Sequence, residues 1–474
     1  MADERFEEHL RHPRGHRAIP EGAFDGSAGG AACGDLVRIG LTIDGERITA
    51  AGFEASGCGA VTAAASAAIE LIEGETILVA ARIGASDIAA ELGGLSAGKL
   101  HAADLVSDAM HWALGAAAKS AGAMPATPNR TLVAMSGGVD SAVAALLCTR
   151  AEDADVCAVT LELWRDPEND AESSCCSAAA VRVARGLAHR MGLPHLTIDL
   201  RDDFRAGVVD PFLADYAAGL TPNPCVRCNG HVRLDAMVEL ADRLGAAALA
   251  TGHYARIRDG LLALAADPAK DQTYMLSALA PETIARLRFP LGELTKPEVR
   301  ALAEEAELPV ARAPESQDLC FLAGTGKARF LERHGRLRDR DGAIVDGDGR
   351  ELGRHRGAHH YTVGQRKGLG VSMPGSGGAP EPLYVLSTDT SANTVTVGPR
   401  AELATTRVGL REVTLHVAPE AVDAVKLRYR QRPLVGRLEG ETIVLADPVD
   451  GAAPGQAAML LSGDRIVGSA WIVA

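Results

Sequence analysis

A hexapeptide, Ser136-Gly137-Gly138-Val139-Asp140-Ser141, separates a short apolar run at 131–135 from an apolar segment that begins at residue 142. The first run is typical of a buried strand, and the second of the start of a helix. A glycine-rich turn between a strand and a helix leaves backbone N–H groups at the positive end of the helix dipole. The hexapeptide therefore predicts an anion site with additional hydroxyl donors from its serines.

The hexapeptide has no lysine where the phosphate loop of kinases and GTPases carries one. It resembles instead the pyrophosphate loop of enzymes that cleave ATP to AMP and pyrophosphate and activate a carbonyl oxygen as its adenylate. An ordinary glycine-rich turn between a strand and a helix is the alternative interpretation.

The length of 474 residues is enough for about three domains, each with its own core. No run of about 20 apolar residues is present, and the charged N-terminus lacks the apolar segment of a signal peptide. We therefore expect a cytoplasmic protein with no membrane contact.

The net charge of −14 argues against a general nucleic-acid coat protein. Residues 327–367 are nevertheless rich in cations, and we expect either a local basic face for nucleic acid or a solvated charged surface. The cations are Lys327, Arg329, Arg333, Arg336, Arg338, Arg340, Arg350, Arg354, Arg356, Arg366 and Lys367.

The nine cysteines are an odd number, which does not favour a framework of structural disulfides in a cytoplasmic chain. Metal, cluster or sulfur chemistry is the expected use of some of them. Cys148 and Cys157 have apolar neighbours and are predicted to lie in the core. The adjacent pair Cys175-Cys176 is ambiguous, and we expect a structural or incidental role.

Residues 1–122 are predicted to form a small α+β domain. Alternating apolar residues at 36–43 indicate a strand, Asp44-Gly45 a tight turn, and 47–53 the returning strand of a hairpin. Helices are expected at 60–72 and 102–118. Residues 123–130 form a linker rich in proline and small residues.

Residues 131–323 alternate between strand and helix patterns, which favours a doubly wound parallel α/β domain. Ligands of such sheets bind beyond the carboxyl ends of the strands, so the hexapeptide and Thr251-Gly252-His253 are expected to lie there. The expected strands are 131–135, 156–163, 194–200 and 246–251, and the expected helices are 178–191 and 234–244.

A small glycine- and arginine-rich central domain is expected at 324–380, and a C-terminal β-barrel at 381–474. The fold class is thus multidomain, α/β and β. The strand-like runs assigned to the barrel are 384–386, 394–397, 425–429, 442–445 and 457–461.

A proline-stiffened loop, Thr221-Pro222-Asn223-Pro224-Cys225-Val226-Arg227-Cys228-Asn229, carries a C-x-x-C motif, and Cys320 lies in a second motif at 315–321. With the hexapeptide, these segments resemble the tRNA-specific 2-thiouridylase family, which converts the wobble uridine of tRNA to 2-thiouridine. The resemblance covers roughly 131–474 and continues through the segments 251–255, 270–274, 360–370, 427–431 and 454–456.

The resemblance implies a tRNA sulfurtransferase that uses ATP to adenylate the C2 oxygen of the uridine. Asp140 is suited to positioning Mg²⁺. The family's catalytic nucleophile matches Cys228, its persulfide carrier matches Cys320, and a Cys228–Cys320 disulfide is the implied product. The ATP-binding positions match Met135, Ser136, Gly137, Gly138, Val139, Asp140, Ser141, Leu163 and Gly252. The tRNA-binding positions match Asn223, Pro224, His253, Lys270, Asp271, Gln272, Arg428, Tyr429 and Gln456.

Cys225 departs from the family, many members of which have aspartate at this position. Cys225, Cys228 and Cys320 could hold a [4Fe–4S] cluster with one open iron for sulfide. The sulfur would otherwise come from a persulfide. A structural zinc ion is a third alternative, and it would need a fourth ligand.

Residues 1–122 resemble iron–sulfur cluster scaffold proteins through Cys33, Asp35, Cys58 and His101, which could hold a [2Fe–2S] cluster. The family's third cysteine, which usually receives sulfur from a desulfurase, is replaced by Ala102. A docking domain is therefore the alternative. A tethered scaffold would raise the local concentration of its cargo to roughly millimolar. The expected sulfur donor is a cysteine desulfurase or a sulfur relay.

Two other functions remain open on the residues alone. One is another pyrophosphate-loop synthetase that acts on a small carbonyl compound. The other is an iron–sulfur or sulfur carrier with a degenerate catalytic module. AMP release that depends on tRNA would separate the thiolating enzyme from both.

Overall fold

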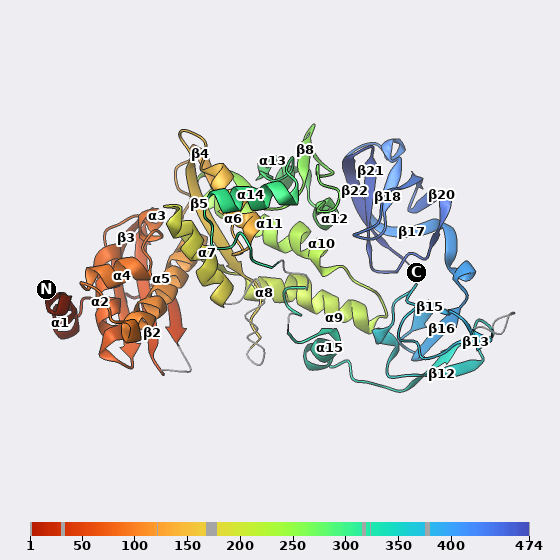
Figure 1. Cartoon of the computed structure of the whole chain (residues 1–474), viewed down its shortest axis with the longest axis horizontal. Helices are drawn as coiled ribbons and strands as arrows, with labels where there is room; N and C mark the ends of the chain where they lie inside the picture. Colours follow the sequence, from red (N-terminus) through yellow and green to blue (C-terminus); the bar gives the residue numbers. More distant parts are fainter. Residues whose placement is uncertain are drawn as a thin grey trace. The chain divides into compact units, whose positions relative to one another are not determined.

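A computed structural model describes residues 2–29, 34–120, 122–166, 178–314, 319–322, 324–374 and 380–473. The chain forms two compact units. Figure 1 labels their helices and strands in chain order. The first comprises Met1–Arg201, Ala236–His253 and Arg286–Phe321, and the second comprises Asp202–Asp235, Tyr254–Ala285 and Leu322–Ala474. Within the described ranges, no helix is both long enough and apolar enough to span a bilayer.

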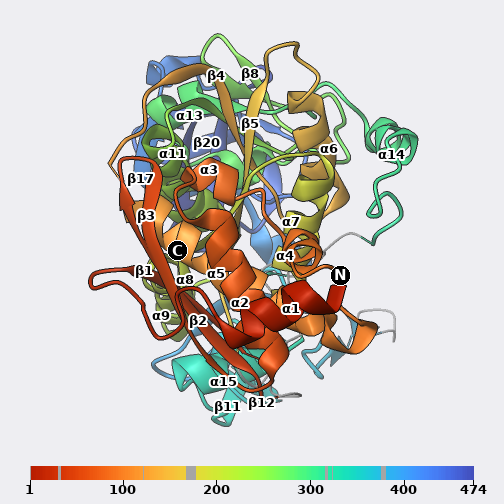
Figure 2. The same cartoon turned by 90° about the vertical axis from the view of Figure 1, so that its left-hand side faces the viewer.

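The N-terminal part of the first unit is a three-stranded antiparallel sheet with helices packed against it (Figure 2). The predicted hairpin is present, and a strand that sequence reasoning did not identify, β1, pairs with β2. The strands are β1 (Phe24–Gly29), β2 (Leu36–Asp44) and β3 (Arg47–Ser56). The helices are α1 (Ala2–Arg11), α2 (Gly59–Ile72), α3 (Ile77–Ala80), α4 (Ala85–Glu91) and α5 (Leu100–Ser120).

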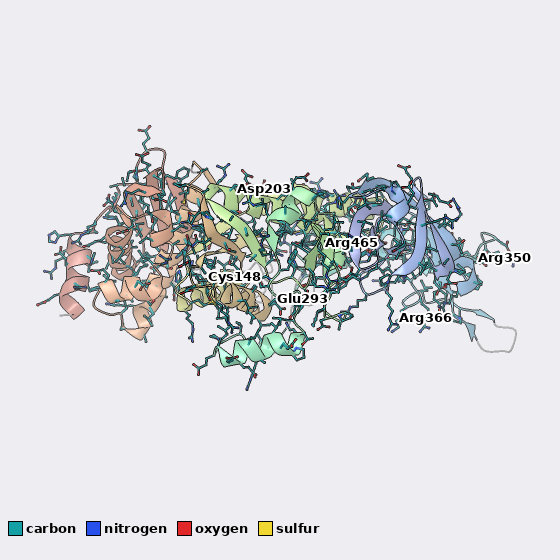
Figure 3. The ribbon with its side chains drawn as sticks, turned by 90° about the horizontal axis from the view of Figure 1, so that it is seen from above. Cys148, Asp203, Glu293, Arg350, Arg366 and Arg465 are labelled. Atoms are coloured by element: carbon teal, nitrogen blue, oxygen red, sulfur yellow. The ribbon has the colours of Figure 1, made fainter. Side chains whose placement is uncertain are left out.

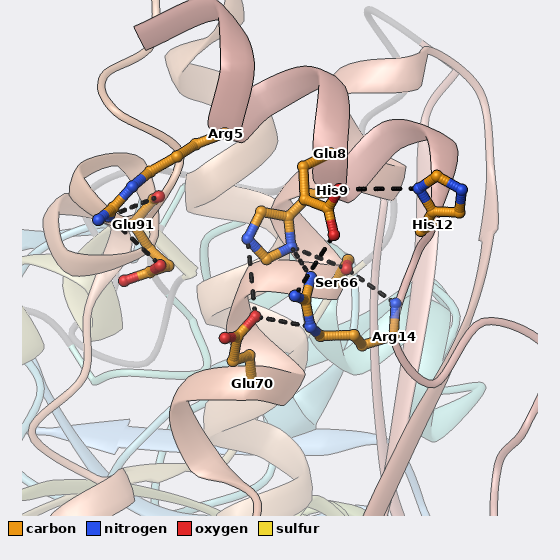
Figure 4. A network of polar contacts seen from close by, with 8 residues as sticks. All are labelled: Arg5, Glu8, His9, His12, Arg14, Ser66, Glu70 and Glu91. Carbon is orange, nitrogen blue, oxygen red and sulfur yellow. Dashed lines mark hydrogen bonds and ion pairs between the residues drawn. The ribbon is translucent and has the colours of Figure 1, made fainter. Parts of the chain in front are cut away.

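Helix α1 is attached to α2 by a polar network (Figure 4). The His9 ring is buried, and its Nδ1 lies 2.9 Å from the Ser66 hydroxyl. Because that hydroxyl accepts the Arg14 backbone N–H, its proton is available to His9. Burial, followed by the charge of Arg14, lowers the pKa of His9. The Arg14 guanidinium also pairs with Glu70 at 2.8 Å.

The predicted parallel sheet is present in the first unit, with the strand order β10-β7-β4-β5-β6. Its strands are β4 (Thr127–Ala134), β5 (Asp155–Glu162), β6 (His195–Asp199), β7 (Ala246–Thr251) and β10 (Leu287–Arg288). Helices α6 (Val139–Cys148), α7 (Ala178–Arg190), α11 (Leu234–Arg243) and α14 (Lys296–Glu305) accompany them.

Strand β4 begins at Thr127, inside the segment expected to be a linker. The Thr127 N–H donates to the Gly245 carbonyl at 2.8 Å, which joins this segment to the sheet before the apolar run begins. The register with β7 shifts between Thr127 and Thr131. Pro128 lies in this interval and has no N–H to give to a neighbouring strand.

Helix α5 is buried on nearly every face because it packs against β1 and β2 and also against β6 of the parallel sheet. The His111 ring contacts the carbonyl oxygens of Ile83 and His195, each at 2.9 Å. Asp108 of the same helix pairs with Arg182 and Arg185 of α7. The N-terminal sheet and the parallel sheet therefore share one helix as their common core element.

The second unit contains a four-stranded sheet with the order β12-β11-β16-β15. Its strands are β11 (Gly342–Val345), β12 (Glu351–His355), β15 (Tyr384–Asp389) and β16 (Thr394–Gly398), and α15 (Lys327–Gly335) precedes them. The assignment of the runs 384–386 and 394–397 to the barrel was wrong. The strands that contain them bury Val385, Val395 and Val397 with Ile344 of β11 in a separate core.

The barrel itself has six strands and is closed by the pairing of β17 with β22. The strands are β17 (Ala404–Leu415), β18 (Ala424–Lys426), β19 (Leu434–Glu439), β20 (Thr442–Asp450), β21 (Ala457–Ser462) and β22 (Arg465–Ile472). Val425, Leu460 and Ile472 belong to its core. Two short strands from another part of the second unit, β8 (Arg256–Arg258) and β9 (Leu261–Ala263), extend the sheet beside β22.

Close packing of α5 against β6 predicts the effect of adding a methyl group at Gly115. A Cβ there would lie 1.8 Å from the Thr197 carbonyl oxygen, so we expect Gly115→Ala to lower the free energy of unfolding by about 1–3 kcal/mol. Gly186→Ala in α7 is the matched control, because no atom of the described residues outside its own stretch of helix lies within 4 Å of its Cβ position. Helix propensity should leave the control unchanged or raise its stability by up to about 1 kcal/mol. Urea unfolding measures both, and equal stabilities would contradict this account of the contact.

Candidate functional site

The hexapeptide forms the turn between β4 and α6, as predicted. Gly138 directly precedes the helix, and no side chain of the described residues caps this helix start. The Ser141 hydroxyl donates to the Gly138 carbonyl at 3.0 Å and accepts the Ser136 N–H at 3.1 Å. Gly137 has a φ of +78°, which favours glycine. Hydrogen bonds within the turn thus fix its conformation, and it places the N-terminus of α6, which is the positive end of the helix dipole, at the predicted anion site.

Lys296 places a buried cation at this turn. Its Nζ lies 2.7 and 2.8 Å from the two carboxylate oxygens of Asp140, and the residue is 8% exposed. Sequence reasoning missed Lys296. One sequence feature could have indicated it: Thr295 and Glu298 form a capping box at the start of α14, which makes Lys296 the first residue of this helix. A cation in the first turn of a helix opposes the helix dipole, so such a lysine indicates a nearby anionic partner.

The end of β7 approaches the same turn. A Cβ at Gly252 would lie 2.7 Å from the Ser141 backbone nitrogen, so glycine is the residue that fits there. The neighbouring His253 ring nitrogen lies 2.9 Å from the Thr251 hydroxyl, and its ring meets Phe289 edge-on. The expected juxtaposition of the hexapeptide with residues 251–253 is therefore present.

The remaining residues matched to ATP binding are apolar and buried. Met135 follows β4, Val139 begins α6 and Leu163 follows β5, and each is at most 5% exposed. Their contact with a nucleotide stays a prediction.

The C-x-x-C segment is helical and not a loop, which corrects the prediction. Helix α10 (Pro224–Cys228) begins after Asn223, whose side chain accepts the Val226 N–H at 3.3 Å. Asparagine is a favoured residue before a helix, and proline is favoured at the first helical position. Cys225 and Cys228 are three residues apart and both half-buried, so they lie on neighbouring parts of one helical face.

Two connecting segments, one between β20 and β21 and one after β12, brace the chain before α10. The Gln456 side-chain amide donates to the Thr221 carbonyl at 2.7 Å, and the Thr221 N–H donates to the Pro454 carbonyl at 2.8 Å. A Cβ at Gly455 would lie 2.9 Å from the Leu220 side chain. The Thr221 hydroxyl also donates to Thr362 at 3.2 Å. Gln456 thus holds the cysteine-bearing segment in place.

Tyr429 lies among aromatic and charged residues. Burial raises the pKa of Tyr429, and the charges of Asp271, Lys270 and Cys225 also influence the pKa of this side chain. The Tyr429 ring lies 6.3 Å from the Tyr274 ring.

Tyr274 links this group to the start of α10. Its hydroxyl donates to the Ala457 carbonyl at 2.7 Å, and burial raises its pKa while a hydrogen bond with Asn223 opposes that shift. Tyr274 therefore connects Tyr429 with Asn223, two of the residues matched to tRNA binding.

Other residues matched to tRNA binding make internal contacts. The Asp271 carboxylate accepts the Ala265 N–H at 3.1 Å and pairs with the buried Lys426, which sequence reasoning missed, at 3.3 Å. The Gln272 side chain accepts the Tyr254 N–H at 2.9 Å. The Arg428 guanidinium donates to two carbonyls of the barrel segment 450–451. These contacts assign a positioning role to the side chains, and direct tRNA contact stays a prediction.

The other cysteines differ in burial. Cys157 is fully buried as predicted, and burial raises its pKa to about 12. Cys148 is only half-buried, and burial raises its pKa to about 11. Cys320 is half-buried and belongs to the first unit, whereas Cys225 and Cys228 belong to the second. Cys175 and Cys176 lie outside the described residues.

The N-terminal domain brings three predicted ligands together. The buried Asp35 carboxylate accepts the Cys58 N–H at 2.8 Å and lies 3.3 Å from the Cys58 sulfur and 3.1 Å from His101 Nε2. Sulfur, carboxylate and imidazole donors within 4.8 Å of one another fit a metal ion or cluster. Gly57 is required here, because a Cβ would lie 2.0 Å from an Asp35 oxygen. Cys33 lies outside the described residues, and Ala102 is buried.

The cations of 327–367 differ in their surroundings. Arg350 and Arg366 are exposed (Figure 3). Lys327 is half-buried, with its ammonium 5.0 Å from the centre of the Tyr216 ring, and burial lowers its pKa. The segment therefore contains exposed cations available to a polyanion, together with at least one that packs internally.

Four protein families match consecutive parts of the chain. They are the NifU-like N terminal domain (residues 2–121), the tRNA methyl transferase HUP domain (129–324), the tRNA methyl transferase PRC-barrel domain (328–399) and the aminomethyltransferase beta-barrel domain (415–472).

Two curated relatives illustrate the similarity. The bifunctional protein NifU/MnmA of Rubrobacter xylanophilus is 43% identical over 97% of this chain and 96% of its own. The tRNA-specific 2-thiouridylase MnmA of Zymomonas mobilis is 41% identical over 73% of this chain and 94% of its own.

A solved structure of an iron–sulfur cluster assembly scaffold protein from Fervidobacterium islandicum covers 23% of this chain and 94% of its own, with 22% identity and a TM-score of 0.19. Because the Rubrobacter protein is 43% identical over nearly the whole of both chains, the chain belongs to the bifunctional NifU/MnmA family, in which a NifU-like domain precedes a tRNA 2-thiouridylase.

Proposed function

We propose that the chain is an ATP-dependent tRNA sulfurtransferase that adenylates the C2 oxygen of the wobble uridine and replaces it with sulfur. The observation that carries this proposal is the set of residues that contact the C-x-x-C helix and the segment before it. Residues matched to tRNA contact cap α10 (Asn223), lie beside Cys225 (Tyr429) and brace the preceding segment (Gln456). A base held by these residues would meet a thiol.

The pair of Lys296 and Asp140 supports use of ATP at the hexapeptide. The first N–H groups of α6 would bind the departing pyrophosphate, with Lys296 as a second source of positive charge. When the phosphates arrive, the Lys296 ammonium would move from the Asp140 carboxylate to a phosphate oxygen. Asp140 would then be released to hold Mg²⁺, whose preferred ligands are oxygens. The α–β phosphate bond breaks as the uridine O2 takes the AMP group.

Sulfur transfer then needs a nucleophile for C2. In the persulfide route, the terminal sulfur of a Cys320 persulfide attacks C2 and AMP leaves with the oxygen. The Cys228 thiolate next attacks the Cys320 sulfur, which releases the 2-thiouridine and forms a Cys228–Cys320 disulfide. A thiol reductant reopens that disulfide. The alternative is a [4Fe–4S] cluster, for which Cys225, Cys228 and Cys320 form the right donor set and which would supply sulfide.

The N-terminal domain is proposed to deliver a cluster or sulfur to this chemistry. Asp35, Cys58 and His101 would hold the cargo, with Cys33 as a further ligand. Cys58 is exposed, which suits transfer to a partner. A cysteine desulfurase or a sulfur relay would load the domain.

The Lys296→Gln variant tests the use of ATP at the hexapeptide. We expect the rate of tRNA-dependent AMP formation to fall by about 10²–10³-fold, because a positioned charge opposite the pyrophosphate is lost. Lys296→Arg, which keeps the charge, should retain more activity. Urea unfolding of each variant shows whether loss of the buried pair also reduces stability. Parental AMP formation in Lys296→Gln would refute the role of this lysine, and AMP formation without tRNA would favour a small-molecule synthetase.

The Cys320→Ala variant tests the division of labour between adenylation and sulfur transfer. Thiolation of tRNA should be abolished while AMP formation persists, because adenylation needs no thiol. Cys148→Ala is the matched control, since a thiol with a raised pKa stays protonated near neutral pH and is a poor nucleophile. Mass spectrometry of the tRNA nucleosides measures thiolation. An iron–sulfur carrier would form no AMP in either variant.

Iron and acid-labile sulfide in the full chain, purified without oxygen, decide the sulfur source. A cluster at the thiolation site predicts about four irons that are lost in Cys225→Ala and kept in Cys58→Ala. Iron lost in Cys58→Ala alone would assign the metal to the N-terminal domain. Thiolation by an iron-free Cys225→Ala chain would establish the persulfide route.

A further inference from the structure

We propose that Asp339, His359 and His360 form a binding site for Zn²⁺ in the central domain, separate from the sulfur chemistry. A carboxylate oxygen of Asp339 and one ring nitrogen of each histidine all lie within 4.8 Å of one another. Two imidazoles and one carboxylate are a donor set that zinc prefers, with a fourth position left for water.

The geometry of the three side chains is already close to that of a metal site. His360 Nε2 lies 2.9 Å from Asp339 Oδ1, and the His359 and His360 rings lie 4.1 Å apart between centres. His359 is 8% exposed, and its Nε2 has no hydrogen-bond partner among the described residues. A buried imidazole nitrogen without a partner is costly, and a bound cation would satisfy it.

The backbone that carries the ligands is held by one buried residue. The Asn393 side-chain oxygen accepts the Ala358 N–H at 3.1 Å, and its amide donates to the Arg340 carbonyl at 2.9 Å. Each contact is made to a residue next to a ligand, His359 in one case and Asp339 in the other. Asn393 therefore fixes the two ligand segments relative to each other, as the supporting residues of metal sites do.

Gly357 makes room for the histidine rings. Its φ is +149°, and a Cβ there would lie 2.6 Å from Cε1 of His359 and 3.3 Å from Cδ2 of His360. The His355 ring accepts the Gly357 N–H at 2.9 Å and so fixes the turn that begins the short helix Ala358–His360.

A metal bound here would join the segment after α15 to the segment that leads into residues 361–370. Residues 361–370 include Thr362, which contacts Thr221 just before the cysteine-bearing helix. Zinc at Asp339 would thus stabilise a support of the thiolation site without touching the reacting sulfur. It is a structural ion in this proposal, and the chemistry does not pass through it.

Cobalt(II) titration of the metal-free full chain tests the site, because Co²⁺ accepts the same ligands as zinc and is visible. Co²⁺ on thiolates shows intense sulfur-to-metal charge transfer, whereas a histidine and carboxylate site shows only the weaker d–d bands. We expect about one equivalent of Co²⁺ of the second kind, displaced by Zn²⁺. Its affinity should fall at least about 10-fold in Asp339→Asn and in His360→Gln.

Both variants alter side chains that are at least partly exposed, so folding should survive. His12→Gln is the matched control, since His12 also lies near a carboxylate, Glu8, at 3.7 Å on an exposed surface. Cys58→Ala should remove thiolate-bound Co²⁺ and leave this component intact. The proposal is overturned if the parent chain binds no Co²⁺ without charge transfer, or if Asp339→Asn and His360→Gln bind it as the parent does.

Discussion

The ion pair between Lys296 and Asp140 joins distant parts of the first unit at the glycine-rich turn. Asp140 belongs to α6, directly after β4, while Lys296 begins α14, more than 150 residues later in the chain. A buried charge must be compensated, so the two segments are held together by the cost of separating them. Gly252, at the end of β7, reaches the same turn. Two parallel strands and two helix starts therefore meet at one point, and that point is also the predicted anion site. If a phosphate group replaced Asp140 as the partner of Lys296, the charge of the buried lysine would still be compensated.

In the second unit, a very short helix depends on the segments around it for its position. Helix α10 has five residues, too few to be stable alone. Its start is set by Asn223 and Pro224, and its approach is fixed by Gln456 and Pro454 from the barrel. The barrel thus acts on the thiols through the backbone before them, whatever contact it makes with RNA. The side chains of Gln456 and Asp271 are both engaged in hydrogen bonds inside the protein, so we expect any functional role of theirs to be one of positioning.

The sequence allowed prediction of those features that rest on local patterns. The hairpin at residues 36–53 and the alternating strands and helices of the parallel sheet follow from hydrophobic periodicity, and they are present. The helix at α10 was misjudged because two prolines suggested a loop, although proline is favourable at a first helical position. The strands at 384–389 and 394–398 were assigned to the wrong sheet because periodicity identifies a strand and not its partner. Lys296 and Lys426 escaped notice because each is defined by a carboxylate more than 150 residues away.

The N-terminal domain raises the question of how a NifU-like domain is joined to a tRNA 2-thiouridylase, and α5 gives a physical answer. This helix ends the N-terminal domain, yet it also fills the space beside β6, so the two parts share a core and are not merely tethered. His101, in the first turn of α5, contacts Asp35, while Gly115 of the same helix touches β6. A rigid helix therefore runs from the proposed cargo site to the parallel sheet. Replacement of the usual third cysteine by Ala102 occurs on this helix, at a fully buried position. The domain thus lacks the thiol that the resemblance assigns to sulfur uptake, while Asp35, Cys58 and His101 are present to hold a cargo.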